Sequence, residues 1–168
     1  MEKTNKTYFR MMSFIHEDLY TLFRNPYHAL TAAGLRPGMK VIEFGAGPGF
    51  FSIPAARIVG EKGSLYTLDI NPYAVEKVRR KVTASGLKNI TVLQADAAHT
   101  SLPVSSFDLV FMFGFMRPIG NVDEIWAEAF NLLKDGGTLA VEGRLYPPQW
   151  MFVPIGGNGR ITRYRKVS

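Results

Sequence analysis

The sequence predicts a doubly wound α/β fold, in which helices cover both faces of a mostly parallel β-sheet. Three observations lead to this prediction. Short apolar segments alternate with amphipathic ones from residue 40 to residue 141. The apolar segments lack the polar alternation of a strand with one wet face, so both faces are expected to be buried. With 168 residues, of which 46% are hydrophobic, the chain can bury one core, and we expect a single domain over residues 1–168.

Residues 1–37 are expected to form a helical cap on this domain. From Ser13 to Arg24, apolar side chains recur at helical spacing, and Asn25-Pro26 ends the pattern. Tyr27–Ala33 is expected to form a shorter helix that ends at Gly34, because glycine readily takes the left-handed conformation that follows a helix.

The segment 38–142 is expected to form the core of the fold. Turn and cap residues mark its helices: Asn71 and Pro72 begin one that ends at Gly86, and Asn121 with Glu124 begins another. The predicted strands are Lys40–Phe44, Leu65–Leu68, Ile90–Gln94, Phe107–Phe113 and Thr138–Val141. The predicted helices are Phe50–Val59, 72–85 and a third that runs from Asn121 to the turn at Asp135-Gly136-Gly137.

The segment 143–168 breaks the alternation, because prolines and glycines are frequent in it. We expect a long loop followed by one strand at Arg160–Val167. The sheet would then have a shortened C-terminal edge. An unpaired edge is a template for another strand, so a homodimer through this edge is a hypothesis.

The composition excludes several classes of protein. The absence of cysteine excludes disulfides, thiolate zinc sites and cysteine nucleophiles, and it favours a cytoplasmic protein. The most apolar stretch, Leu109–Met116, is shorter than the roughly 18 residues of a membrane span, so none is expected. The net charge is +6, but Arg79-Arg80-Lys81 fits a solvated helix face and the basic residues of 160–166 fit an edge strand. Nucleic acid is therefore not the expected partner.

A glycine-rich turn follows the first core strand and opens a helix. The turn reads Gly45-Ala46-Gly47-Pro48-Gly49. Glycines there let backbone amides approach a ligand, and the start of the helix attracts an anionic group. The turn suits either a dinucleotide pyrophosphate or the carboxylate of an amino-acid ligand. The dinucleotide spacing GxGxxG would need a small residue at the position of Phe50, so the GxGxG spacing favours the second ligand.

Polar residues also follow the next strands. Asp69 ends the second strand, where a carboxylate accepts hydrogen bonds from both hydroxyls of a ribose, whether of NAD or of another nucleoside. Asp96 follows the third strand and is placed to bond the exocyclic amine of an adenine. The fourth strand delivers Phe113 beside the first strand, at the expected topological switch point.

With these four motifs in this order, the segment 38–142 resembles the class I S-adenosylmethionine-dependent methyltransferases, especially the small-molecule branch of quinone-biosynthesis (type 11) methyltransferases. The resemblance implies a Rossmann-like fold and an enzyme that binds S-adenosylmethionine and releases S-adenosylhomocysteine. It places Glu43 and Gly45, Ala46, Gly47 and Gly49 at the methionine part of the donor, Asp69 with neighbouring Ile70 at the ribose, Asp96 with Ala97 at the adenine, and Phe113 with Gly114 near the methyl group.

The acceptor is expected to be a small, partly hydrophobic molecule. Methyltransferases that act on nucleic-acid amines or protein glutamine often carry Asn/Asp-Pro-Pro-aromatic after this strand, where the chain has Phe113-Gly114-Phe115-Met116-Arg117-Pro118. Positioning accelerates methyl transfer from a sulfonium, and an acceptor with a high pKa also needs a base. His16, His28 and His99 are candidates for that base, although no residue is assigned as catalytic. No metal site is expected.

Three other functions stay open. A methyltransferase that acts on RNA or protein would use the basic tail. A donor-binding protein without catalysis would account for the short C-terminus and the lack of a clear base. A nicotinamide-dependent dehydrogenase is disfavoured by Phe50.

Overall fold

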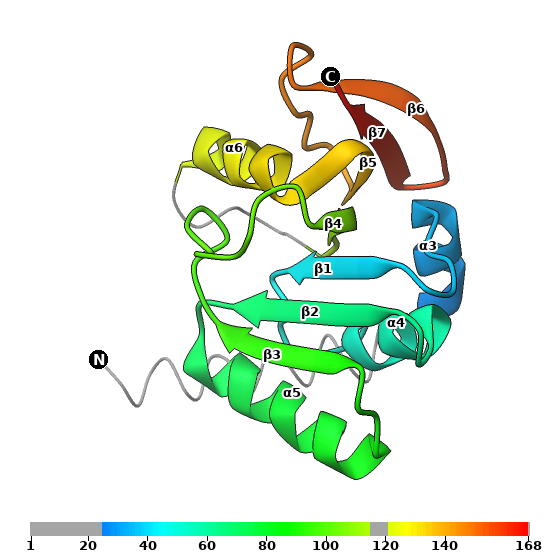
Figure 1. The fold of residues 1–168 in the computed structure, drawn as a ribbon, viewed down its shortest axis with the longest axis vertical. Coiled ribbons are helices and arrows are strands. Elements are labelled where there is room, and N and C mark those ends of the chain that lie inside the picture. Colours follow the sequence, from blue (N-terminus) through cyan, green and yellow to red (C-terminus); the bar gives the residue numbers. More distant parts are fainter. Residues whose placement is uncertain (1–24, 115–120, 168) are drawn as a thin grey trace.

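A seven-stranded sheet runs through the described part of the protein (Figure 1). The computed structural model describes residues 25–114 and 121–167, so the predicted helix at Ser13–Arg24 lies outside the described residues. The strand order is β3-β2-β1-β4-β5-β7-β6, with β1 to β5 parallel and β7 antiparallel to both of its neighbours. The strands are β1 (Lys40–Phe44), β2 (Ser64–Asp69), β3 (Ile90–Gln94), β4 (Phe107–Met112), β5 (Leu133–Glu142), β6 (Phe152–Asn158) and β7 (Ile161–Lys166).

Helices cover both faces of this sheet. On one face, α3 and α4 pack into an apolar cluster that receives Val41 and Phe111 from the sheet. On the other face, α6 packs into a second cluster, which receives Ile42 and Val110. Alternate residues of β1 and β4 therefore face opposite layers, which confirms the doubly wound α/β fold. The helices are α3 (Pro26–Ala33), α4 (Ser52–Val59), α5 (Pro72–Ser85) and α6 (Val122–Leu132), and none of these described helices has the length and apolar character to cross a bilayer.

The predicted caps begin two of the helices. The Asn71 side chain accepts a hydrogen bond of 2.9 Å from the Tyr73 amide at the start of α5, and Asn121 accepts one of 3.1 Å from the Asp123 amide at the start of α6. These bonds satisfy backbone donors that have no partner within the helix. Helix α4 begins at Ser52, two residues later than predicted, because the glycine-rich turn extends through residue 51.

The boundary between α6 and β5 differs from the prediction. The helix was expected to continue to Asp135-Gly136-Gly137, but it ends at Leu132, and Leu133 already belongs to β5. Leu133 pairs with Phe107 of β4, and both side chains are fully buried. A leucine at this point fits the apolar stripe of a helix as well as a buried strand, so periodicity does not mark the boundary.

The C-terminal segment forms two strands, so the prediction of one strand and a shortened edge is wrong. The predicted strand at Arg160–Val167 is confirmed as β7, which pairs with β5. The segment Phe152–Asn158, expected to be loop, forms β6 and pairs with β7. An edge strand tolerates Pro154 because one side of it lacks a neighbouring strand. With both strands present, the reason for expecting a dimer through a missing edge no longer holds.

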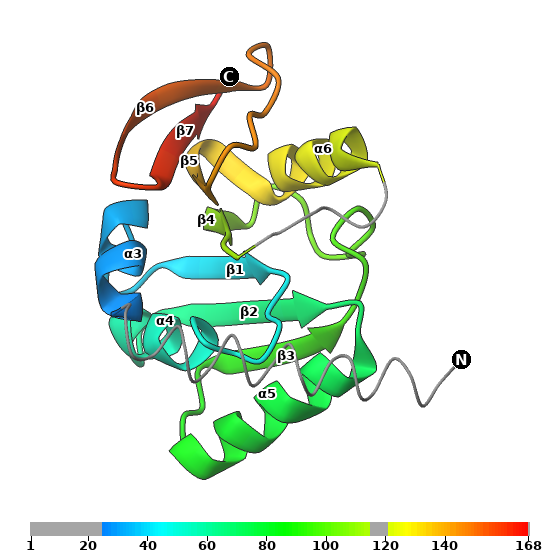
Figure 2. The same cartoon turned by 180° about the vertical axis from the view of Figure 1, so that it is seen from behind.

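The connection between β5 and β6 contains no helix. Strand β6 runs parallel to β5, so residues 143–151 must return from the end of β5 to the start of β6. Leu145 and Met151 of this connection pack on the same apolar cluster as α6. Figures 1 and 2 both show the connection and the β6–β7 hairpin at the end of the protein opposite β3 and α5.

Candidate functional site

The strand order places the predicted site residues at one edge of the sheet. Strand β1 lies between β2 and β4, so the chain leaves β1 toward one side and returns on the other. Ligands of such sheets bind at the carboxyl ends of the strands around this switch point. The glycine-rich turn, Asp69, Asp96 and Gly114 follow or end β1, β2, β3 and β4 respectively, so the fold brings the four predicted motifs to the same edge (Figure 1).

The amides of the glycine-rich turn, which were expected to approach a ligand, have partners within the chain. The amides of Gly45 and Ala46 donate to the Leu68 carbonyl at 2.9 and 2.8 Å. The Gly47 amide donates to Asp69 Oδ2 at 2.8 Å, and the Gly49 amide donates to the Ala46 carbonyl at 2.9 Å. These bonds hold the turn against the end of β2. Its shape is therefore set before any ligand binds.

Two glycines of the turn serve different purposes. Gly47 has a φ of +51°, and a Cβ at this position would meet no atom within 4 Å, so open space lies next to it. Gly49 has a φ of +80°, and a Cβ there would lie 3.0 Å from Val78 Cγ2 on α5. Both backbones favour glycine. Gly49 lets α5 approach the turn, whereas Gly47 faces open space.

Both carboxylate oxygens of Asp69 accept hydrogen bonds from backbone amides, one in the glycine-rich turn and one at the start of α5. Oδ2 accepts the bond from Gly47, and Oδ1 accepts one of 2.8 Å from the Asn71 amide. Burial raises the pKa of Asp69 above its ordinary value, while these two bonds act in the opposite direction. An ionised carboxylate offers about four acceptor positions, so about two remain for ribose hydroxyls. The neighbouring Ile70 is 49% exposed and adds an apolar surface beside the carboxylate.

Glu43 lies buried beneath the glycine-rich turn. Its Oε2 accepts hydrogen bonds from Ser52 Oγ at 2.5 Å and from Thr67 Oγ1 at 2.6 Å. Burial raises the pKa of Glu43 to about 7, although both hydroxyl bonds lower it. The carboxyl group thereby ties β1, α4 and β2 together. Its predicted contact with the amino group of the donor stays a prediction.

The sequence interpretation missed Ser52 and Thr67. Both are fully buried polar residues. The available signal was a small hydroxyl residue at a position where helix or strand packing demands an apolar side chain, because buried hydroxyls require partners.

The loop after β3 carries Asp96 and Ala97. Asp96 is exposed, and its Oδ1 accepts a hydrogen bond of 2.9 Å from the Ala98 amide. The Ala95 amide donates to the Asp69 carbonyl at 3.2 Å, so the loop is linked to the ribose-site candidate. This arrangement leaves the second carboxylate oxygen of Asp96 open to solvent. Contact of Asp96 and Ala97 with an adenine stays a prediction.

The end of β4 differs in detail from the expectation. The Phe113 side chain is buried and packs against the rings of Phe51 and Phe111, with centroids 5.1 and 5.0 Å away, so it belongs to the core. Gly114 is exposed, and its amide donates to Glu142 Oε2 at 3.0 Å. Glu142 ends β5 beside Gly114 and was missed by the sequence interpretation. The available signal was an acidic residue directly after the apolar run of the fifth predicted strand.

The structure describes two of the three histidine candidates, and they lie at different edges of the sheet. His99 is exposed in the loop after β3, on the side of Asp96. His28 belongs to α3, which lies toward the amino ends of β1 and β2 (Figures 1 and 2). His16 and the segment 115–120 lie outside the described residues. Over the described ranges, no group of three His, Asp or Glu side chains is arranged to hold a metal ion.

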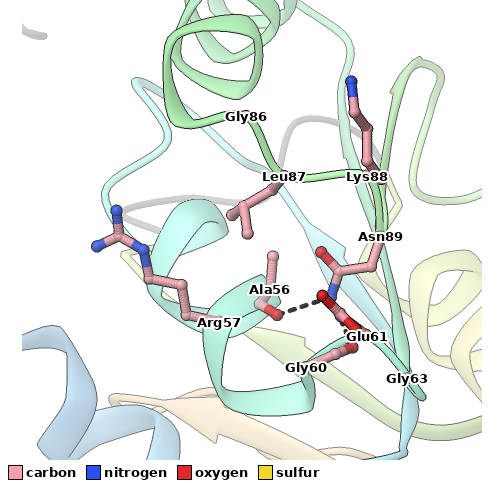
Figure 3. A pocket seen from close by; sticks show the side chains of 9 residues that line it. All are labelled: Ala56, Arg57, Gly60, Glu61, Gly63, Gly86, Leu87, Lys88 and Asn89. Atoms are coloured by element: carbon pink, nitrogen blue, oxygen red, sulfur yellow. Dashed lines mark hydrogen bonds between the residues drawn. The ribbon is translucent and has the colours of Figure 1, made fainter.

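A pocket of about 730 Å³ lies elsewhere, between the C-terminal ends of α4 and α5 (Figure 3). Asn89 lines it and donates from Nδ2 to the carbonyls of Ala56 and Gly60, both at 2.8 Å. Asn89 lies just before β3, at the amino ends of the strands. The pocket thus lies at the edge of the sheet opposite the one that holds the predicted motifs.

Known proteins resemble the chain over about two thirds of its length. The chain is 34% identical over 113 residues to a ubiquinone/menaquinone biosynthesis C-methyltransferase UbiE of Shewanella pealeana, a match that covers 67% of the chain and 45% of that protein. The enzyme of the same name from Vibrio vulnificus is also 34% identical over 113 residues, with 67% and 44% covered. The chain therefore spans less than half the length of these curated relatives.

Solved structures share the fold. A structure described as a SAM-dependent methyltransferase from Aquifex aeolicus superposes with a TM-score of 0.76 at 24% identity, covering 95% of this chain and 98% of that one. An arsenic(III) S-adenosylmethionine methyltransferase from Chlamydomonas reinhardtii gives a TM-score of 0.58 at 29% identity, covering 70% and 43%. Residues 35–144, which contain all four motifs, match the family described as methyltransferase domain. The chain belongs to this family of methyltransferase domains.

Proposed function

We propose that the protein binds S-adenosylmethionine at the carboxyl ends of β1, β2 and β4, and that it transfers the methyl group to a small hydrophobic acceptor. One observation carries the proposal most directly. Asp69 Oδ2 is bonded to the Gly47 amide, and open space lies next to Gly47. The bond joins Asp69, predicted to bind the ribose, to the glycine-rich turn, predicted to bind the methionine part of the donor.

The residues present fit this cofactor. Asp69 keeps acceptor positions for ribose hydroxyls, and exposed Ile70 offers apolar contact beside them. The absence of a side chain at Gly47 leaves room for the ligand. S-adenosylmethionine supplies an electrophilic methyl group on a sulfonium when bound. We propose that the acidic group of buried Glu43, which accepts from Ser52 and Thr67, faces the cationic part of such a ligand.

The chain's own contribution to the reaction is positioning. The turn, Asp69 and the loop after β3 are joined by backbone hydrogen bonds, so the binding surface needs little reorganisation. Glu142 holds the Gly114 amide and fixes the backbone at the end of β4, where the acceptor would approach. A fixed approach geometry alone is worth roughly 7 kcal/mol or more of a displacement barrier.

For the acceptor, we propose a small molecule of quinone type. The support is the name of the relatives, which are C-methyltransferases of ubiquinone and menaquinone biosynthesis. A cytoplasmic location and the single-domain organisation stay predictions. The homodimer also stays a prediction, although the missing sheet edge that suggested it is not present. No observation in the described residues favours RNA, protein or the absence of catalysis over this proposal.

Calorimetric titration with S-adenosylmethionine, S-adenosylhomocysteine and NAD tests the proposal. We expect micromolar binding of the first two, with NAD much weaker. Asp69→Ala should lose about 1–3 kcal/mol of binding free energy, because a charged hydrogen-bond acceptor is removed. Glu61→Ala, which removes an exposed carboxylate beside the pocket at the opposite end, is the matched control. Unchanged affinity in Asp69→Ala, or preference for NAD, would refute the proposed site.

A further inference from the structure

Two buried hydroxyl groups bind the same carboxylate oxygen of Glu43. Ser52 Oγ donates to Oε2 at 2.5 Å, and Thr67 Oγ1 donates to it at 2.6 Å. Ser52 and Thr67 are fully buried, and Glu43 is 2% exposed. A hydroxyl group has a single proton to donate, so both donors are used on this one atom. Oε2 is therefore held as an acceptor.

The sheet register brings these three side chains together. Glu43 and Thr67 are paired directly across β1 and β2. Val41 and Leu65, two residues earlier on the same strands, pack in the apolar cluster that contains α4, so Glu43 and Thr67 face the same layer. Ser52 is the first residue of α4 in this layer. The carboxyl group thus lies where β1, β2 and α4 meet.

The other carboxylate oxygen of Glu43, Oε1, stays available. No hydrogen bond reaches it from residues 25–114 and 121–167, yet the protein does not enclose this atom completely. The glycine-rich turn begins two residues after Glu43, and Asp69 lies close enough to act on Glu43 electrostatically. Oε1 is therefore the oxygen that a ligand in the proposed donor site can reach.

A proton bound to the Glu43 carboxyl group has one place to sit. Because Oε2 accepts from two donors, that proton must lie on Oε1. The amino group of S-adenosylmethionine or S-adenosylhomocysteine is a cation, and a cation forms a strong hydrogen bond with a free carboxylate oxygen. The proton and the amino group cannot occupy the same oxygen together, so they should compete for it.

The surroundings of Glu43 place this competition close to neutral pH. Burial raises the pKa of Glu43 to about 7, and the charge of Asp69 adds to the rise. The hydrogen bonds from Ser52 and Thr67 lower this pKa, as does Lys81 on α5. Without the two hydroxyl bonds, Glu43 would keep its proton to a higher pH.

The other charged side chains on neighbouring elements act elsewhere. Arg57, the charged residue of α4, is exposed in the last turn of that helix. Asp108 of β4 lies near the amino end of its strand, where it accepts from the Lys40 amide and from Lys134 Nζ, both at 2.7 Å. The turn between β1 and α4 contains no charged residue. Asp69 and Lys81 are therefore the groups whose titration must be separated from that of Glu43.

We propose that Ser52 and Thr67 are positioning residues, which turn Oε1 of Glu43 toward the donor, so that donor binding expels a proton from this oxygen into solvent. This inference rests on the proposed donor site. It adds a regulatory property to that site, because the protein should release its donor as the solution becomes acidic while the fold is retained.

Calorimetric titration with S-adenosylhomocysteine measures the competition in the full chain. We expect the affinity to be about tenfold weaker at pH 6 than at pH 8, because about nine tenths of the Glu43 side chains are protonated at pH 6. Titration in two buffers of different ionisation enthalpy should show about one proton released per ligand at pH 6 and about none at pH 8. Glu43→Gln should remove both effects, because an amide does not titrate.

A ligand without the amino group separates Glu43 from Asp69. The thioether of 5′-deoxyadenosine with 4-mercaptobutyrate has the structure of S-adenosylhomocysteine without this group. Its affinity should not rise between pH 6 and pH 8, because it has no cation that competes with the proton. Titration of Asp69 at the ribose would instead change the affinities of both ligands alike.

Variants of the two hydroxyl residues test the positioning itself. Ser52→Ala and Thr67→Val each remove a bond that lowers the pKa of Glu43, so the midpoint of the pH dependence should move upward by about one pH unit. Thr91→Val, at an exposed position of β3, is the matched control and should keep the wild-type midpoint. Thermal unfolding checks that each variant is folded. A purely structural role would lower stability without moving the midpoint.

Three results would overturn the proposal and leave the donor site in place. The first is equal affinity for S-adenosylhomocysteine at pH 6 and pH 8, with no proton released. The second is the same pH dependence for the ligand that lacks the amino group. The third is an unchanged midpoint in folded Ser52→Ala and Thr67→Val. Failure of S-adenosylhomocysteine to bind at any pH from 6 to 8 would refute the donor site, and this inference with it.

Discussion

The Gly47 amide and Asp69 Oδ2 are joined by a 2.8 Å hydrogen bond, although 22 residues separate them in the chain. The bond links the turn after β1 to the end of β2, which are neighbouring parallel strands. Because Asn71 occupies the other carboxylate oxygen, Asp69 also fixes the start of α5. A substitution in the turn therefore affects both the stability of the fold and the proposed donor site.

Alanine substitutions at three glycines separate these two effects. Gly38, Gly47 and Gly49 all have positive φ, but a Cβ would meet atoms within 4 Å only at Gly49, where it would meet Val78, Lys81 and Ser52. We expect each alanine to cost about 1–2 kcal/mol in unfolding free energy through backbone strain. Gly49→Ala should cost about 1–3 kcal/mol more, because the Cβ crowds the Val78 side chain of α5. Urea denaturation measures these differences.

Ligand affinity distinguishes Gly47 from its control. Gly47→Ala should weaken S-adenosylhomocysteine binding about tenfold or more, because its methyl group enters the proposed donor space. Gly38→Ala, between α3 and β1, carries similar backbone strain and should bind normally. Equal affinity of the two variants would show that the ligand does not lie beside Gly47.

The Glu43 carboxyl group should make stability depend on pH. Its pKa is about 7 in the folded protein and 4.5 as the ordinary value, so the folded state binds more protons between these limits. The free energy of unfolding should therefore fall as the pH rises from about 4.5 through about 7. The stabilisation by the protonated group is fully present below pH 4.5 and lost above pH 7. Its size is at most about 3 kcal/mol.

Glu43→Gln isolates this contribution. Glutamine keeps an oxygen to accept from Ser52 and Thr67 but does not titrate. We expect the difference in unfolding free energy between variant and wild type to change across pH 5 to pH 8, in favour of the variant at high pH. Glu61→Gln, at an exposed position, should leave the profile unchanged. A constant difference between Glu43→Gln and wild type over this range would mean that Glu43 titrates normally.

Asn89 should stabilise the fold without affecting the donor site. Its Nδ2 donates to the carbonyls of Ala56 and Gly60 at the end of α4, each of which also accepts from one backbone amide. Asn89→Ala should lower the unfolding free energy by about 1–3 kcal/mol, because two side-chain hydrogen bonds are lost. Thermal and urea unfolding measure the loss. The affinity for S-adenosylhomocysteine should stay within about twofold of wild type, and a larger change would indicate coupling between the two ends of the sheet.

The core of the fold was predictable because its signals are local. The apolar runs of β1 and β4 are buried on both faces, so their residue types alone identify them. Asn71 and Gly86 define α5 through a capping bond and a left-handed residue. Strand β6 was not predictable in this way, because it contains Pro154 and Gly156, and its main-chain bonds depend on a distant partner, β7.

The predicted motifs lie together at one edge of the sheet, but several of their interactions within the chain were not predicted, and their contacts with a donor stay a prediction. The four motifs meet at one edge because parallel strands end there, which is a property of the pattern. The bonding of the Gly47 amide and of Glu43 depends on which side chains the packing brings within reach. Ser52 and Thr67 lie 9 and 24 residues from Glu43 in the chain, so no local rule pairs them with it.

The amino-acid sequence by itself determined the alternation of strands and helices, the helix caps and the order of the site motifs, because these depend on neighbouring residues. Only the tertiary structure decided that the sheet has a complete antiparallel edge, that the turn amides are already bonded, and that Phe113 belongs to the core. Each of these outcomes arises from contacts between segments far apart in the chain. These contacts stabilise the protein only once the sheet has formed.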